Sequence, residues 1–115
     1  AISTFIKRRD YVEVVKASSL PIGILDSIQP EAASLKLRDE DMIIMITDGV
    51  LDNTSKGEKA DEWLVKVIDS LDTRNPQEMA DHIMEAVLKI EGRDKSKPFG
   101  DDMTIMATRV WKPVI

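Results

Sequence analysis

Two acidic residues, Asp48 and Asp101, stand at junctions between an apolar segment and a loop, where functional side chains are often held rigidly. Asp48 follows a run that opens with the apolar residues Met42–Ile46, and Gly49 behind it permits a sharp turn. Asp101 has the mirror arrangement, because it precedes the apolar segment 104–110. Hard divalent cations such as Mg²⁺ and Mn²⁺ prefer carboxylate oxygen as a ligand. We therefore expect the two segments to lie side by side and both acids to bind metal.

Each motif also has a simpler interpretation. Asp-Gly is a common turn and Gly-Asp-Asp a common loop, so what favours a site is their joint occurrence beside two apolar segments. A calcium loop starting at Asp52 is excluded, because Lys56 occupies a ligand position and Trp63 replaces the bidentate Glu. His82 is the one histidine, and its charged neighbours on a helix predict that it faces solvent and is not a catalytic base.

The composition is that of a small globular domain or a piece of a larger one. The chain has 115 residues, 43% of them hydrophobic and 4% aromatic, so aliphatic residues and Met must fill the core. The net charge of −5 argues against a nucleic-acid partner. The absence of cysteine excludes disulfides and thiolate metal sites and fits a reducing compartment. No segment has the length of a transmembrane helix, so no membrane contact is expected from these residues.

The acids must be positioned by strands on either side of them. Residues Ile2–Lys7 and 11–16 are rich in β-branched and aromatic residues and predict a hairpin, whose basic turn at 7–9 we expect to be solvated. Residues 31–37 suit a short edge strand. The apolar run 42–46 predicts a central strand that is buried on both faces.

Two helices are expected between the central strand and the last one. Apolar residues recur at helical spacing over Ala60–Leu71. The second helix has clear start signals, with Asn75 as N-cap, Pro76 at the first helical position and Glu78 in the capping-box position. Gly92 suits its C-terminal cap. Strands, two helices and a returning strand predict an α+β layered domain.

Taken together, these motifs resemble a known family. The strand into Thr47-Asp48-Gly49, the two helices, and Gly100–Thr104 with its closing strand resemble the second half of the metal-dependent type 2C (PPM) protein serine/threonine phosphatases. Within that class, three segments are most similar to the C-terminal phosphatase domain of the bacterial stage II sporulation protein E family, namely Ser3–Arg8, 17–24 and Asn75–Glu78. The resemblance covers essentially the whole chain.

The resemblance implies a fold and a mechanism. The fold is an α-β-β-α layered sandwich, an antiparallel β-sandwich flanked by helix pairs. Residues 1–115 would be a single domain fragment, its C-terminal half, truncated at the N-terminal side. Two Mn²⁺ or Mg²⁺ ions bind at one edge, and a water that bridges them attacks phosphorus in line. By motif, Asp48 and Asp101 correspond to ligands of one metal, and no catalytic residue is expected beyond the metal ligands. Asp102 replaces a common Asn and is not assigned as a ligand.

The resemblance also implies a substrate and a location. The substrate is a phosphoserine on a protein partner, an anti-sigma-factor antagonist, whose dephosphorylation leads to sigma-factor activation in sporulation. The domain is expected in the cytoplasm, on the cytoplasmic side of the membrane if the parent protein is tethered there. The family's first metal motif is absent upstream of Asp48, so we expect the fragment alone to be inactive. Uncovered edges and faces of a truncated sheet predict its self-association.

Two other interpretations stay open. One is a non-catalytic regulatory or binding module of the same fold, in which Asp48 and Asp101 are only structural. The other is a related stress-response phosphatase with a different partner. An Asp-Gly motif and a further acid upstream would favour an enzyme, and their absence would favour the module.

Overall fold

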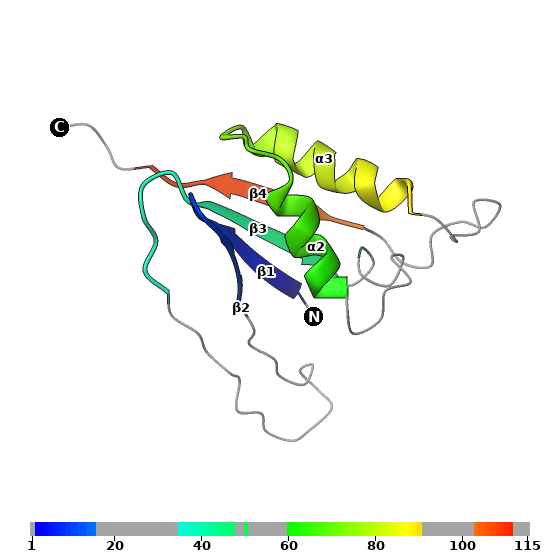
Figure 1. The fold of residues 1–115 in the computed structure, drawn as a ribbon, viewed down its shortest axis with the longest axis horizontal. Helices are drawn as coiled ribbons and strands as arrows, with labels where there is room; N and C mark the ends of the chain where they lie inside the picture. The colour runs from blue at the N-terminus through cyan, green and yellow to red at the C-terminus, as the bar shows by residue number, and fades with distance from the viewer. Residues whose placement is uncertain (1, 16–34, 48–49, 51–59, 91–102, 112–115) are drawn as a thin grey trace, which may run out of the picture.

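The computed structural model describes residues 2–15, 35–47, 50, 60–90 and 103–111. These residues form a four-stranded antiparallel sheet, in the order β2-β1-β3-β4, and two helices (Figure 1). The elements are, in chain order, β1 (Ile2–Lys7), β2 (Val12–Val15), β3 (Met42–Thr47), α2 (Ala60–Asp69), α3 (Pro76–Leu88) and β4 (Ile105–Arg109). The predicted α+β class and the predicted order of strands, two helices and a returning strand are confirmed.

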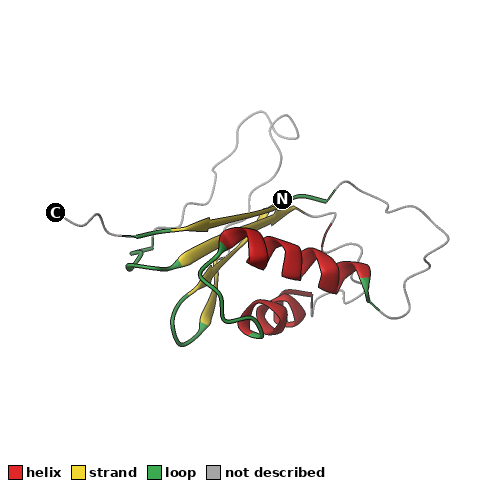
Figure 2. Cartoon of the chain, turned by 90° about the horizontal axis from the view of Figure 1, so that it is seen from above, coloured by secondary structure: helices red, strands yellow, loops and turns green. Residues whose placement is uncertain are grey.

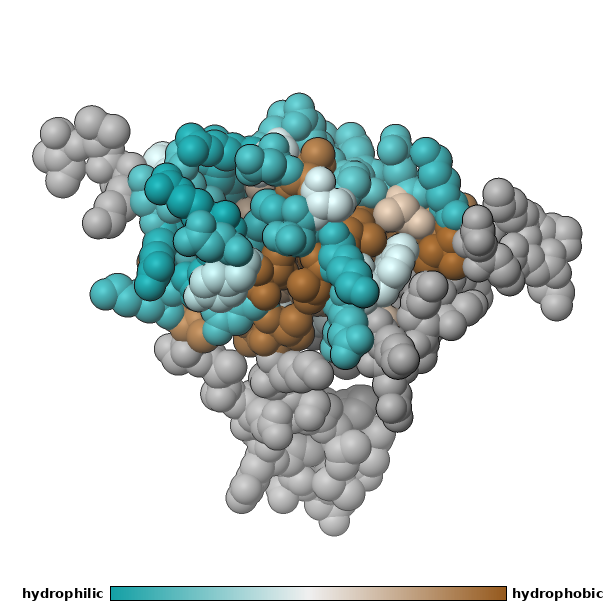
Figure 3. All heavy atoms as spheres, in the orientation of Figure 1, coloured by the Kyte–Doolittle hydropathy of each residue, from teal (hydrophilic) through white to brown (hydrophobic). Residues whose placement is uncertain are grey.

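Both helices lie on one face of the sheet, as Figure 2 shows from above. The side chains between the helices and this face form the hydrophobic core. The register places Ile44 of β3 between Phe5 of β1 and Ala107 of β4 on this face. The inward residues of the helices are fully buried in the same cluster: Leu64, Ile68, Met79, Ile83 and Val87. Burial of each large apolar side chain contributes roughly 1.5–3 kcal/mol, which holds the helices on the sheet. The face seen in Figure 3 is hydrophilic over its upper and left parts, and hydrophobic side chains are visible across its centre.

The opposite face of the sheet carries apolar side chains that no described helix covers. Ile43 and Met45 of β3 are half-buried, and Met106 of β4 is 50% exposed. Along β3, fully buried side chains therefore alternate with half-buried ones. The predicted burial of this strand on both faces is not reached within the described residues, because α2 and α3 pack on the same side.

The start of α3 follows its sequence signals, with one difference. The Asn75 side chain accepts hydrogen bonds from the backbone N–H groups of Gln77, at 2.9 Å, and Glu78, at 3.4 Å, so the predicted N-cap is confirmed. The capping box is not formed directly. The Thr73 hydroxyl donates to the Glu78 carboxylate at 2.7 Å and accepts from the Asn75 N–H at 3.1 Å. Thr73 thus joins the two groups that a capping box would join directly.

A β-bulge lies just before β3. Glu40 N–H donates to Val110 O at 2.6 Å, and Val110 N–H donates to Asp41 O at 2.8 Å, so two residues oppose one. Glu40 has a φ of 71°, which usually favours glycine at the first position of such a bulge. The turn is closed by Asp41 N–H, which donates to Arg38 O at 3.1 Å. An ion pair of 2.9 Å between Glu40 and Arg74 joins the bulge to the loop between the helices.

The predicted edge strand at 31–37 and the predicted end of the second helix differ from the described structure or lie partly outside it. Residues 35–37 are not in a strand, and the rest of the predicted edge strand lies outside the described residues. Gly92, the predicted C-cap of the second helix, also lies outside them, and α3 ends with Lys89 in the cap position. Within the described part of the chain, no helix combines the length and apolar character needed to cross a membrane.

Candidate functional site

The predicted metal ligands Asp48 and Asp101 lie outside the described residues, as does Asp102. The structure describes the residues next to them, Thr47 at the end of β3 and Thr104 just before β4. Because β3 and β4 are antiparallel neighbours, the end of one strand meets the start of the other at the same edge. The two strand ends therefore lie side by side, as the sequence predicts.

The described residues next to Asp48 and Asp101 in the sequence are held by hydrogen bonds and by burial. Thr47 N–H donates to Thr104 O at 3.1 Å, and Thr104 N–H donates to the Thr47 hydroxyl oxygen at 2.9 Å. Two residues beyond Asp48, Val50 is fully buried in the hydrophobic core. Met103 is partly buried and packs against the same core. The described residues on either side of Asp48, Thr47 and Val50, are thus both held by the packed sheet and core.

The residue types next to these strand ends in the sequence suit a hard divalent cation. Asp48 follows Thr47 and Asp101 comes three residues before Thr104, and carboxylate oxygen is the donor that Mn²⁺ and Mg²⁺ prefer. Within the described residues, no group of three or more His, Cys, Asp or Glu side chains is arranged to hold a metal. The metal site therefore remains a prediction about residues next to the described ones.

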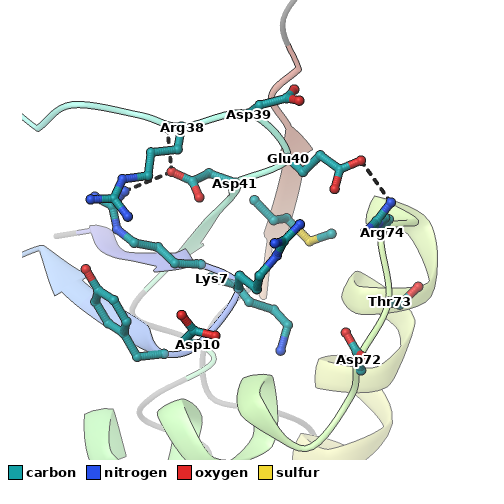
Figure 4. A pocket seen from close by; sticks show the side chains of 13 residues that line it. Lys7, Asp10, Arg38, Asp39, Glu40, Asp41, Asp72, Thr73 and Arg74 are labelled. Atoms are coloured by element: carbon teal, nitrogen blue, oxygen red, sulfur yellow. Dashed lines mark hydrogen bonds and ion pairs between the residues drawn. The ribbon is translucent and has the colours of Figure 1, made fainter.

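A charged cavity of about 550 Å³ lies at the other end of β3, between the β1–β2 turn, the bulge and the loop that joins the helices (Figure 4). The strand between this cavity and Thr47 has six residues, which corresponds to about 20 Å of extended chain. The cavity is therefore separate from the edge at which Thr47 and Thr104 meet. Its charged lining residues are Lys7, Arg8, Arg9, Asp10, Arg38, Asp39, Glu40, Asp41, Asp72 and Arg74.

Asp41 is the buried acid of this cavity and is 3% exposed. Its carboxylate accepts hydrogen bonds from Arg8 Nη1 at 2.9 Å and from Arg38 N–H at 2.7 Å. Arg8 also pairs with Glu13 at 3.1 Å and donates to Lys36 O at 3.2 Å. Since these buried groups satisfy one another, Asp41 joins the hairpin to the start of β3 and is not a free acid for chemistry.

Arg8 corrects the expectation of a solvated turn, because its side chain is only 9% exposed. Lys7 differs as well, since its ammonium donates to Ile68 O near the end of α2 at 3.1 Å. A cation at that position donates a hydrogen bond to a carbonyl at the helix C-terminus and interacts favourably with the negative end of the helix dipole. Sequence reasoning missed both roles because the partners are distant along the chain, at Asp41 and at Ile68.

His82 corrects a second expectation, because it is half-buried and does not simply face solvent. Its Nε2 lies 2.9 Å from Val67 O and 2.9 Å from the Ser70 hydroxyl oxygen, at the end of α2. The packing of α3 against α2 brings the imidazole to these groups. The expectation that His82 takes no part in catalysis stays a prediction.

Comparisons with known proteins agree on one family. The family model described as Stage II sporulation protein E (SpoIIE) matches residues 2–111. Stage II sporulation protein E of Bacillus subtilis (strain 168) is 39% identical over 107 residues, and that of Priestia megaterium is 36% identical over 107 residues. Both alignments cover 93% of this chain, but only 12% and 18% of the two relatives. The chain thus spans less than a fifth of their length.

Solved structures of the Bacillus subtilis protein show the same fold. Its PP2C phosphatase domain with a fragment of the regulatory domain has a TM-score of 0.82 and 36% identity, covering 99% of this chain and 32% of that one. The Mn-presoaked phosphatase domain has a TM-score of 0.77 and 32% identity, covering 98% of this chain and 48% of that one. These matches confirm the expected phosphatase-domain fold. From the family match and these identities, the chain belongs to the Stage II sporulation protein E family.

Proposed function

We propose that these residues form part of a metal-dependent protein serine/threonine phosphatase domain of the SpoIIE type. The observation that supports this best is the pairing of β3 with β4, which brings the strand ends beside Asp48 and Asp101 to one edge. The similarity to solved phosphatase domains supports it independently. The substrate that we propose is a phosphoserine on an anti-sigma-factor antagonist, and the location that we propose is the cytoplasmic side.

In this proposal Asp48 and Asp101 are ligands of Mn²⁺ or Mg²⁺, and the sheet holds them in place. The Thr47–Thr104 hydrogen bonds hold the end of β3 against the start of β4, and Val50, two residues beyond Asp48, is fully buried. When bound, the metal supplies Lewis acidity toward the oxygens of a phosphoryl group. The strands contribute a rigid arrangement of acids that is set before substrate binds.

The chain by itself is proposed to be inactive, as one part of a single phosphatase domain. It covers 48% of the solved phosphatase domains to which it is similar. Two carboxylates hold a hydrated Mg²⁺ or Mn²⁺ weakly, because the cation keeps its water unless further ligands compete. The remaining ligands would come from another part of the parent protein.

A Mn²⁺ titration tests this proposal. In the complete phosphatase domain of the parent protein, Asp48→Asn and Asp101→Asn are each expected to weaken Mn²⁺ binding at least about tenfold, because each removes a charged ligand. The isolated 115 residues are expected to bind Mn²⁺ more weakly than the complete domain and to release no phosphate from a phosphoserine peptide. Isothermal titration calorimetry and phosphate release measure the two effects.

Asp10→Asn is the matched control, because Asp10 is exposed at the opposite end of the sheet. It should leave Mn²⁺ affinity unchanged. Unchanged affinity in both Asp48→Asn and Asp101→Asn would favour the non-catalytic module instead. Hydrolysis by the isolated chain, lost in Asp48→Ala, would contradict its proposed inactivity.

The isolated chain is also proposed to self-associate through the sheet face that carries Ile43, Met45 and Met106. Burial of these side chains between two copies would remove apolar surface from water. Sedimentation velocity is expected to show a dimer or larger species, and Met106→Lys should shift it toward monomer. Leu88→Lys is the control, because Leu88 is 43% exposed on α3. A monomer at every concentration would contradict the proposal.

A further inference from the structure

The last rung between β3 and β4 departs from a regular antiparallel ladder. In a regular hydrogen-bonded pair, each residue donates its N–H to the backbone carbonyl of the other. Thr47 does so toward Thr104 O, at 3.1 Å. In the reverse direction Thr104 N–H donates to the Thr47 hydroxyl oxygen, at 2.9 Å, in place of the backbone carbonyl. A side chain therefore closes the final rung of the sheet.

This substitution has a geometric consequence. Thr104 is bonded to Thr47 at two points, through its carbonyl oxygen to the backbone N–H and through its own N–H to the side-chain hydroxyl. The end of β3 and the start of β4 are therefore held together at this pair by a side chain as well as by the backbone. Of the two residues joined by these hydrogen bonds, Thr47 comes one residue before Asp48 and Thr104 comes three residues after Asp101.

We infer that Thr47 is a positioning residue, whose hydroxyl holds the end of β3 and the start of β4 together beside the two acids and thereby sets the affinity of the metal site. The inference rests on the proposed function, because it takes Asp48 and Asp101 as ligands. Groups that orient metal ligands from behind typically change metal affinity by about 10–100-fold when they are removed. A hydroxyl that only completed the strand would change folding stability and leave metal affinity as it was.

Three variants of the complete phosphatase domain separate these roles. Thr47→Val keeps the shape and removes the hydroxyl, and it is expected to weaken Mn²⁺ binding at least about tenfold. Thr47→Ser keeps the hydroxyl and should stay within about threefold of the parent domain. Thr108→Val is the matched control, because Thr108 is exposed on β4 and its hydroxyl has no hydrogen bond to another described residue. Calorimetric Mn²⁺ titration gives the affinities, and amide exchange of Thr104 reports directly on its hydrogen bond to the Thr47 hydroxyl.

Each outcome has a clear meaning. Faster exchange at Thr104 in Thr47→Val, with unchanged Mn²⁺ affinity, would overturn the inference and leave Thr47 a structural residue. An equal loss in Thr47→Ser would also overturn it, since the hydroxyl is retained there. Thr47→Ala provides a second variant without the hydroxyl, should Thr47→Val not fold. Unchanged affinity in Asp48→Asn and Asp101→Asn would instead overturn the proposed function, so the two failures are distinguishable.

Discussion

Asp41→Ala is expected to lower the free energy of unfolding by about 3–5 kcal/mol. The side chains of Asp41 and Arg8 are 4% and 9% exposed, so removal of the carboxylate leaves a buried guanidinium without its closest acid. Glu13 remains as a partial partner, with its side chain 35% exposed. The Arg38 N–H also loses its acceptor, which adds the cost of an unsatisfied group. Urea denaturation followed by circular dichroism measures the change.

The exposed ion pair of the same cavity is the control for this variant. Arg74→Ala breaks the Glu40–Arg74 pair, whose side chains are 30% and 65% exposed, and it should cost less than about 1 kcal/mol. A double variant, Arg8→Met with Asp41→Leu, should recover part of the loss, because it removes both buried charges. Equal costs for Asp41→Ala and Arg74→Ala would contradict the importance of burial.

Ile44→Ala is expected to lower the free energy of unfolding by about 2–5 kcal/mol. Ile44 is fully buried in the centre of the sheet, where it is flanked by Phe5 and Ala107 and covered by the helices. The Ala variant loses the transfer free energy of the removed methyl and methylene groups, and the cavity that remains loses further contacts. Urea denaturation followed by circular dichroism measures this change in the free energy of unfolding as well.

Met106→Ala is the matched control on the other face of the sheet. Met106 is 50% exposed, and a substitution at such a position usually changes stability by about 0.5 kcal/mol or less. A loss as large as that of Ile44→Ala, in the monomeric chain, would mean that the second face is covered. That result would contradict the one-sided packing of the helices.

Local signals predicted the local structure well. Asn75 and Pro76 begin α3 as expected, because an N-cap depends on residues within one turn. The apolar run 42–46 predicted β3, and the β-branched segments predicted the hairpin of β1 and β2. The predictions that were wrong concern side chains whose hydrogen-bond or ion-pair partner lies far away in the sequence. Arg8 was expected in solvent, and its acid Asp41 lies 33 residues away.

The bulge at Glu40 shows the same limit for the backbone. A positive φ of 71° at a glutamate has no propensity signal, because glutamate does not favour that region. The conformation is supported by hydrogen bonds to Val110 and by the ion pair with Arg74. His82 is comparable, since only the packing of α3 on α2 brings Ser70 and Val67 to its ring.

The sequence by itself determined the helices and strands and their order along the chain. It also determined that one acid follows a strand and another precedes a strand. Each of these features depends on residues that are neighbours in the sequence. Only the tertiary structure decided that Thr47 pairs with Thr104, which lie 57 residues apart. That pairing depends on register, and register is set by which faces of β3 and β4 are buried against the helices. The sequence thus predicts that the two strand ends lie side by side, but which residues pair there is a property of the packed sheet.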